Sequence, residues 1–212
     1  MVMNTPLAVQ PHDLLWGMRL SDLPGDSPDW VFEVISQGQP VVVRRASVAA
    51  GQVAVGIRGL RREQRYAATM ACSAIERQVR PEQLTHLTDR NPQRWPALEA
   101  LSQVRPVMDV LDLSWGVSGS AGFELASGFA ALHQGSDLDL ILRTPEPVSR
   151  SWAAELVEAL ETSICRVDVQ LQLAEGAVAL REWAGPSRQI LFKSSTDTRL
   201  VSDPWQQPGM SA

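Results

Sequence analysis

The chain has few cysteines and no long apolar run. Among its 212 residues there are two cysteines, Cys72 and Cys165, which lie far apart in apolar segments. We expect both to be reduced core residues and not a disulfide pair. No stretch approaches the ~20 apolar residues of a membrane span, and the N-terminus lacks the pattern of a signal peptide. These absences predict a cytoplasmic protein without a membrane partner.

Histidine and lysine are also scarce. The three histidines (His12, His86 and His133) are scattered without metal-ligand spacing, and Lys193 is the sole lysine. The formal net charge of −5 argues against binding to nucleic acid. A hydrophobic content of 44% is typical of a folded protein, and the length allows one domain or two small ones.

The arginines are unevenly placed. Six of them lie in a short stretch that contains one acid, Glu63; they are Arg44, Arg45, Arg58, Arg61, Arg62 and Arg65. Codon bias and a solvated face explain the preference for arginine, but they explain the clustering less well. Because the guanidinium fork suits phosphate and carboxylate groups, the cluster indicates binding of substrate phosphates or of an acidic protein.

Two aspartates in the second half suggest a definite chemistry. Asp137 and Asp139 alternate with Leu138, Leu140 and Leu142, which predicts a buried strand with both carboxylates on its other face. Their Cβ atoms would lie ~6–7 Å apart, where the charges repel unless a cation binds them. Oxygen ligands of this kind suit Mg²⁺. A solvated acidic face is the alternative interpretation.

A glycine-serine turn precedes this strand. Residues 115–120 are typical of a strand end followed by a turn at Gly119 and Ser120, and a helix would start near Ala121. Such a turn presents backbone N–H groups and a hydroxyl at a helix N-terminus, which favours an anion. We therefore predict that Gly119 and Ser120 bind substrate.

A third carboxylate fits the same scheme. Residues 166–173 alternate polar and apolar side chains, with Asp168 on the polar face, and the preceding segment 152–160 has helical spacing. The predicted order is strand, helix, strand. Three aspartates on neighbouring strands can hold metal ions, and Asp168 can accept a proton from an attacking hydroxyl. An exposed carboxylate, or an ion pair with Arg166, is the alternative.

The C-terminal part predicts a strand over 189–193, a turn, and a further strand ending near Val201. Lys193, beside the hydroxyl residues of the turn, is a candidate contact for a triphosphate. A surface lysine in a hairpin is the alternative.

These segments together resemble a known family. The phosphoribosyl-dephospho-CoA transferases of malonate decarboxylase, in the polymerase β-like nucleotidyltransferase superfamily, share a pattern that runs here from about Leu14 to Trp205. It is carried by Val55-Gly56-Ile57-Arg58-Gly59, Gln64-Arg65-Tyr66-Ala67, Gly119-Ser120-Ala121-Gly122-Phe123-Glu124, Ser127-Gly128 and Ser136-Asp137-Leu138-Asp139-Leu140. Ser127-Gly128 stands where the family is expected to have Thr-Gly, and the gap between Gly119-Ser120 and the aspartates exceeds the usual superfamily spacing.

The resemblance implies a specific reaction. Such enzymes transfer a prosthetic group from 2′-(5″-triphosphoribosyl)-3′-dephospho-CoA to a serine of the decarboxylase's apo acyl carrier protein and release pyrophosphate. It implies Mg²⁺ held by Asp137, Asp139 and Asp168 as catalytic residues. Substrate contacts would come from Gly119, Ser120, Arg58 and Lys193, and carrier-protein contacts from Arg61, Arg62 and Arg65.

The expected fold class is α+β. A small α+β N-terminal domain over 1–87 would bind substrate or partner, with strands near 40–43 and 53–57 and a helix from about Arg62 to Val79. Residues 88–212 would form the nucleotidyltransferase-like catalytic domain, a mixed sheet with helices on one face. Two other functions remain open: a nucleotidyltransferase with another small-molecule or protein target, and a non-catalytic module that binds carrier protein.

Overall fold

The computed structural model describes residues 9–61, 63–86 and 95–206. Contacts between residues divide the chain into two compact units, Met1–Arg80 and Pro81–Ala212, which are described separately below. The domain boundary expected between residues 87 and 88 lies outside the described residues.

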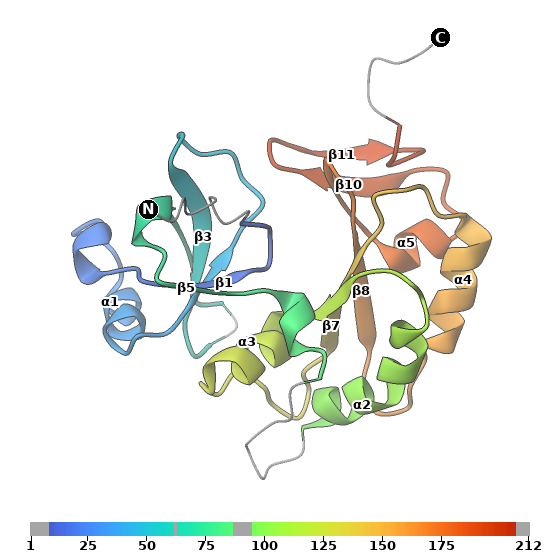
Figure 1. Cartoon of the computed structure of the whole chain (residues 1–212), viewed down its shortest axis with the longest axis horizontal. Helices are drawn as coiled ribbons and strands as arrows, with labels where there is room; N and C mark the ends of the chain where they lie inside the picture. Colours follow the sequence, from blue (N-terminus) through green and yellow to red (C-terminus); the bar gives the residue numbers. More distant parts are fainter. Residues whose placement is uncertain (1–8, 62, 87–94, 207–212) are drawn as a thin grey trace, which may run out of the picture. The chain divides into compact units, whose positions relative to one another are not determined.

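In the first unit the described residues form a five-stranded antiparallel sheet with the strand order β4-β3-β2-β1-β5. One α-helix, α1 (Asp29–Ser36), packs against β3 (Figure 1). The strands are β1 (Leu14–Trp16), β2 (Val41–Val43), β3 (Gln52–Arg58), β4 (Arg65–Ala71) and β5 (Arg77–Val79). Two 3₁₀ turns, η1 (Leu20–Asp22) and η2 (Cys72–Ala74), complete the unit.

The core of this unit lies between α1 and the sheet. Helix α1 buries Val31, Val34 and Ile35, which share one helical face because they are three and four positions apart. They belong to one apolar cluster with Val55 and Ile57 of β3, both fully buried. The expected strands near 40–43 and 53–57 are confirmed, whereas α1 was not predicted.

The helix expected from Arg62 to Val79 is wrong. Arg65–Ala71 forms strand β4, which pairs with β3 along its whole length, from Arg58 opposite Arg65 to Gln52 opposite Ala71. The alanines and charged residues of this segment favour a helix locally, but β4 is an edge strand on which most side chains stay at least partly exposed. Pairing with β3 therefore overrides the weak helical propensity.

In the second unit the described residues form a six-stranded sheet with the strand order β11-β10-β9-β8-β7-β6. Only β7 and β8 run parallel; the other neighbours are antiparallel. The strands are β6 (Trp115–Val117), β7 (Leu138–Arg143), β8 (Val167–Gln172), β9 (Gly176–Ala179), β10 (Ile190–Ser194) and β11 (Thr198–Val201). The helices are η3 (Pro81–Leu84), α2 (Pro96–Asp109), α3 (Gly119–Ser127), α4 (Arg150–Ala159) and α5 (Leu180–Ala184).

The predicted strand, helix, strand order is confirmed as β7, α4 and β8. Leu138, Leu140 and Leu142 of β7 are buried, and α4 begins where the Ser149 hydroxyl accepts a hydrogen bond from the Trp152 N–H at 3.1 Å. Helix α4 packs on α5, and the two lie side by side in Figure 1. The predicted C-terminal strand pair is confirmed as β10 and β11, and the α+β fold class is confirmed.

Helix α2 was not predicted, because prolines and polar residues before Pro106 indicated a loose connection. Pro96 occupies the first turn, where its missing N–H costs nothing, and Pro106 lies inside the helix. An apolar stripe at helical spacing anchors it in the core: Ala97, Ala100, Leu101, Val104 and Met108 are all buried. The spacing of these apolar residues favours a helix, but the prolines of the segment led to the prediction of a loop.

The expectation that both cysteines are core residues is wrong. Cys72 is exposed at the start of η2, and Cys165 is half-buried before β8. Both are free thiols, as expected. Apolar neighbours in the sequence do not bury Cys72 because it follows the edge strand β4.

Candidate active site

The parallel pairing of β7 with β8 brings two of the three predicted carboxylates together. Asp139 on β7 lies opposite Asp168 on β8 in the register of the two strands, and both side chains are half-buried. Residues opposite each other on parallel strands point to the same face and lie ~5 Å apart. Asp137 directly precedes β7 and is exposed. The carboxylates thus gather near the start of these two strands.

Asp168 is held by two arginines. Arg166 donates from Nε to Asp168 Oδ1 at 2.8 Å, and the Nε of Arg181 lies 4.0 Å from the same oxygen. The hydrogen bond to Asp168, and then its negative charge, raise the pKa of the Arg166 guanidinium. The ion pair that was the alternative interpretation of Asp168 is therefore present. Within the described residues, no three His, Cys, Asp or Glu side chains form a group that could hold a metal ion.

The glycine-serine turn lies directly against Asp139. Gly119 begins helix α3 with a φ of +60°, and a Cβ built on it would come within 1.9 Å of Asp139 Oδ2. The N–H of Ser118 donates to the Asp139 carbonyl at 2.9 Å. Only glycine fits here, since it tolerates the positive φ and leaves room for the carboxylate. Ser120, the second residue of α3, is half-buried in the same turn.

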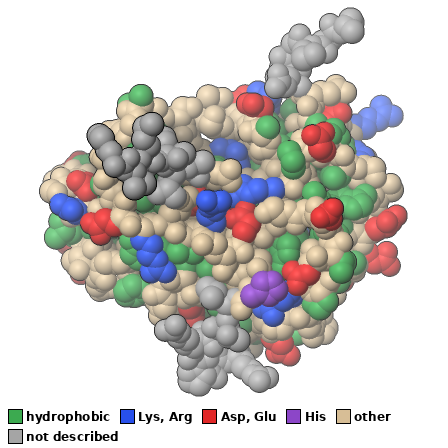
Figure 2. All heavy atoms as spheres, in the orientation of Figure 1, with side chains coloured by type: hydrophobic (Ala, Val, Ile, Leu, Met, Phe, Trp, Pro, Cys, Tyr) green, Lys and Arg blue, Asp and Glu red, His purple; other side chains and the backbone are tan. Residues whose placement is uncertain are grey.

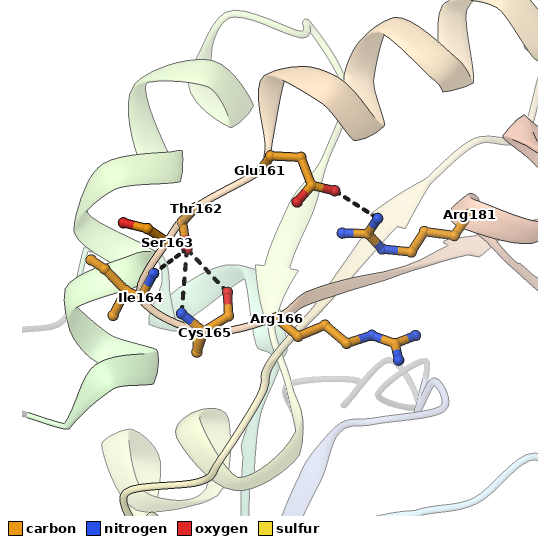
Figure 3. Close-up of a pocket in the computed structure, with 7 residues that line it drawn as sticks. All are labelled: Glu161, Thr162, Ser163, Ile164, Cys165, Arg166 and Arg181. Atoms are coloured by element: carbon orange, nitrogen blue, oxygen red, sulfur yellow. Dashed lines mark hydrogen bonds and ion pairs between the residues drawn. The ribbon is translucent and has the colours of Figure 1, made fainter.

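Arg166 and Arg181, the two arginines next to Asp168, line a pocket of about 550 Å³ (Figure 3). The hydroxyl of Thr162 holds the loop that lines this pocket. It donates to the Cys165 carbonyl at 3.0 Å and accepts from the N–H groups of Ile164 and Cys165. Arg181 Nη1 donates to Glu161 at 2.8 Å. The lining residues are Glu161, Thr162, Ser163, Ile164, Cys165, Arg166 and Arg181. Sequence reasoning missed this pocket because the connection from α4 to β8 carries no recognisable motif.

Cys165 lines this pocket, and the pKa of its thiol is affected by Asp137. Burial raises the pKa of the Cys165 thiol above its ordinary value, and the negative charge of Asp137 raises it further. A hydrogen bond with the backbone of Leu138 partly opposes the rise. Of these three effects, that of Asp137 is the smallest.

Glu124 is a site-adjacent residue that received no role from the sequence. It is 6% exposed on α3, and its carboxylate accepts from Trp95 Nε1 at 3.2 Å. It also accepts from the N–H groups of Ala131 and Leu132 at 2.7 and 2.8 Å. A glutamate among apolar helix neighbours (Phe123, Leu125) was the available signal.

The remaining predicted residues lie elsewhere. Lys193 is exposed on β10, which is separated from β8 by β9, so it is not on a strand next to Asp168. Arg58 ends β3 opposite Arg65, the first residue of β4, and Arg61 lies in the turn between these strands. Arg61 and Arg65 thus do not share the face of a helix, as the wrongly predicted helix required. Arg62 lies outside the described residues. On the face in Figure 2, basic and acidic side chains are interspersed.

Comparisons with known proteins identify the family of the chain. A family model described as the phosphoribosyl-dephospho-CoA transferase MdcG C-terminal domain matches residues 83–204, and its N-terminal counterpart matches residues 10–81. The chain belongs to the phosphoribosyl-dephospho-CoA transferase family. The family's two models meet beside the division between Arg80 and Pro81.

Curated members of the transferase family cover almost the whole chain. A protein of Pseudomonas syringae pv. tomato named phosphoribosyl-dephospho-CoA transferase is 63% identical over 96% of this chain and 97% of its own length. Proteins with the same name from Pseudomonas fluorescens Pf-5 and Azotobacter vinelandii are 59% and 50% identical, covering 95% and 96% of this chain and 96% and 98% of their own lengths. No solved structure matches. Across the described residues, no helix has the length and apolarity to cross a membrane.

The contact between Gly119 and Asp139 predicts a non-additive pair of substitutions. Gly119→Ala should destabilise the protein by about 2–4 kcal/mol, through the positive φ and the clash with the carboxylate. In an Asp139→Ala background the cost should be smaller, because the two closest carboxyl atoms are gone. The Cβ of residue 139, 2.7 Å from the added Cβ, and the backbone term of about 1–2 kcal/mol remain. Denaturant unfolding of the four proteins measures both values. Equal costs in the two backgrounds would show that the glycine does not accommodate the carboxylate.

The raised pKa of Cys165 predicts its alkylation profile. In a Cys72→Ser protein, the midpoint of the alkylation rate of Cys165 by iodoacetamide should lie at higher pH than that of an ordinary thiol, because the thiolate is the reactive form and burial disfavours it. Asp137→Asn should move the midpoint to lower pH by removing a negative charge. Mass spectrometry across a pH series gives both midpoints, and identical profiles with and without the Asp137 charge would contradict the coupling.

Proposed function

We propose that this chain transfers the 2′-(5″-phosphoribosyl)-3′-dephospho-CoA group from its triphosphoribosyl precursor to a serine of the malonate decarboxylase acyl carrier protein. The observation that carries the proposal is the near full-length identity, up to 63%, with proteins named for transfer of this group. The pairing of Asp139 with Asp168 beside a glycine-serine turn supports it, because this geometry suits chemistry at a phosphoryl centre.

The bond changes follow from the substrate. The carrier serine oxygen attacks the phosphorus nearest the ribose, a new P–O bond forms, and the bond to the departing pyrophosphate breaks. The serine proton goes to Asp168, whose Oδ1 is oriented by Arg166 at 2.8 Å. The nucleophile belongs to the partner, so the chain itself needs only to position two substrates and balance charge.

The residues present fit Mg²⁺ by their donor chemistry. Asp137, Asp139 and Asp168 offer hard carboxylate oxygens, and Gly119 leaves the space that the Asp139 carboxylate occupies. As they stand, the three side chains do not form a three-ligand group, so we propose that they would hold the ion only together with oxygens of the substrate phosphates, whose charge the ion would neutralise. Asp168 would then be shared between the ion and Arg166. The N-terminus of α3, with Gly119 and Ser120, would face the same phosphates.

Recognition is assigned to basic side chains. We propose that Arg58 and Lys193 contact the anionic substrate and that Arg61 and Arg65, with Arg62, contact the carrier protein. Arg61 and Arg65 are exposed at the end of the β3–β4 hairpin, where a partner can reach them. Carrier proteins are usually acidic around the modified serine, so charge complementarity supports the pairing.

Reconstitution tests the whole proposal. The purified chain, Mg²⁺, the triphosphoribosyl precursor and apo carrier protein are combined, and the mass of the carrier protein and the released pyrophosphate are followed. A mass increase equal to the prosthetic group on one serine, with stoichiometric pyrophosphate, is expected. An unmodified carrier protein with an intact precursor would refute it.

Substitution of Asp137 or Asp139 tests whether these two carboxylates are needed for transfer. Asp137→Ala and Asp139→Ala should each reduce transfer by at least ~10³-fold, because each removes charge that the metal and phosphates require. Neither should unfold the protein, since a repelling pair of carboxylates is relieved. Single-turnover rates and thermal melts measure both effects. Near-normal turnover of either variant in excess Mg²⁺ would sink the two-aspartate mechanism.

The hairpin arginines should act on encounter rather than on chemistry. Arg61→Glu with Arg65→Glu should lower the association rate with apo carrier protein at low salt, and the difference should shrink as salt screens the charges. Arg19→Glu with Arg77→Glu is the control of equal charge change, because both are exposed arginines elsewhere in the same unit. Stopped-flow binding across a salt series measures the rates. Equal rates for the double variant and the control at low salt would exclude docking here.

A further inference from the structure

The connection between α3 and β7 determines where Asp137 lies. Helix α3 ends at Ser127 because Gly128 adopts a φ of +74°, and the chain then runs without a helix or strand to Leu138. Asp137 is the last residue of this connection and is exposed. The N–H of Leu138, in the peptide that follows Asp137, donates to the Arg166 carbonyl at 2.9 Å. The strand ladder therefore holds Asp137 on one side only, and on the other side its position depends on the connection.

The buried carboxylate of Glu124 holds the middle of the connection. Its Oε2 accepts from the N–H groups of Ala131 and Leu132 at 2.7 and 2.8 Å, and its Oε1 accepts from Trp95 Nε1 at 3.2 Å. A buried carboxylate is costly unless donors surround it, and these three donors meet that need. Two of them are main-chain groups of the connection itself.

Hydrogen bonds among residues 133–136 hold the rest of the connection. The N–H of His133, next to Leu132, donates to the hydroxyl of Ser136 at 3.1 Å, and the Ser136 N–H donates back to the His133 carbonyl at 3.0 Å. Gly135 N–H donates to His133 Nδ1 at 3.1 Å. Ser136 is buried and adjoins Asp137. The hydrogen bonds thus run from Glu124 to the residue before Asp137.

We infer that Glu124 is a positioning residue for the transfer reaction. Helix α3 contacts the surroundings of Asp139 and of Asp137. Its first residue, Gly119, lies against the carboxylate of Asp139, and Glu124 holds the connection that ends at Asp137. Glu124 does not touch the substrate and acts through the backbone of Ala131 and Leu132. The inference rests on the proposed function, in which Asp137 and Asp139 bind the metal ion.

Three variants isolate this role. In Glu124→Gln the carboxamide has one acceptor and one N–H₂ group, so donors face donors either at Trp95 or at the connection. Adding Trp95→Phe removes the Trp95 donor, which lets the amide oxygen accept from Ala131 and Leu132 again. Trp95→Phe alone is the reference for the double variant.

Glu82→Gln is the matched control. Glu82 is another poorly exposed carboxylate of the same unit, and it pairs with Arg143. Arg143 is the last residue of β7, whereas Asp139 is the second. Loss of the Glu82 carboxylate should cost stability without moving the aspartates.

The expected result is a loss and a rescue. If the amide nitrogen introduced by Glu124→Gln faces the connection, hydrogen exchange should show loss of protection at Ala131 and Leu132, and kcat should fall about 10–100-fold with little change in KM for carrier protein. If it faces Trp95, protection and kcat should both stay, and a kcat that falls although protection stays would overturn the inference. The double variant should regain both the protection and most of kcat. Glu82→Gln should lose stability only. A Glu124→Gln protein with exposed amides but a kcat no lower than that of Glu82→Gln would overturn the inference.

Two further outcomes are covered. If Glu124→Gln fails to fold, the kcat of the double variant is compared with that of Trp95→Phe alone. A kcat that stays low in the double variant, although Ala131 and Leu132 are protected again, overturns the inference. If the wild-type protein does not modify carrier protein, the proposed function fails, and Mn²⁺ affinity measured by electron paramagnetic resonance decides instead. Weaker binding in Glu124→Gln with recovery in the double variant supports positioning, and unchanged binding refutes it.

Discussion

The parallel pairing of β7 with β8 is the constraint on which the site depends. Every other neighbouring pair in the six-stranded sheet is antiparallel. A parallel pair needs a crossover, which α4 provides, and it aligns the starts of both strands at one edge. Asp139 and Asp168 therefore meet although the chain between them is long. An antiparallel pair would have placed the start of one strand beside the end of the other.

Helix α3 supplies the second constraint. It enters against β7 through Gly119, where a side chain would collide with Asp139, and it leaves at Gly128. Between these ends Glu124 turns inward to the connection that returns to β7. The short helix thus contacts both the strand that carries Asp139 and the connection that leads to Asp137.

The sequence predicted those parts in which local pattern and tertiary role agree. Alternation in β7 and β8 and the helical stripe of α4 identified the elements that carry the aspartates, and the Gly119-Ser120 turn located the start of α3. Prediction failed where long-range pairing decides. The segment 65–71 has helix-forming residues but pairs with β3 as an edge strand. The role of Glu124 was hidden for the same reason, since Trp95 and Leu132 approach it only in the fold.

Charge balance explains how three carboxylates coexist near one edge. Asp168 is compensated by Arg166 and, at longer range, by Arg181, which also pairs with Glu161. Asp137, in contrast, is exposed to solvent, and its charge acts on the thiol of Cys165. Arg166 and Arg181 thereby offset the charge of Asp168, and exposure to solvent screens that of Asp137. A cation that binds Asp137 and Asp139 would replace water, whereas one that also engages Asp168 must compete with Arg166. On the proposed function, the affinity of this edge for a cation would depend on the strength of the Arg166–Asp168 pair as well as on the number of carboxylates.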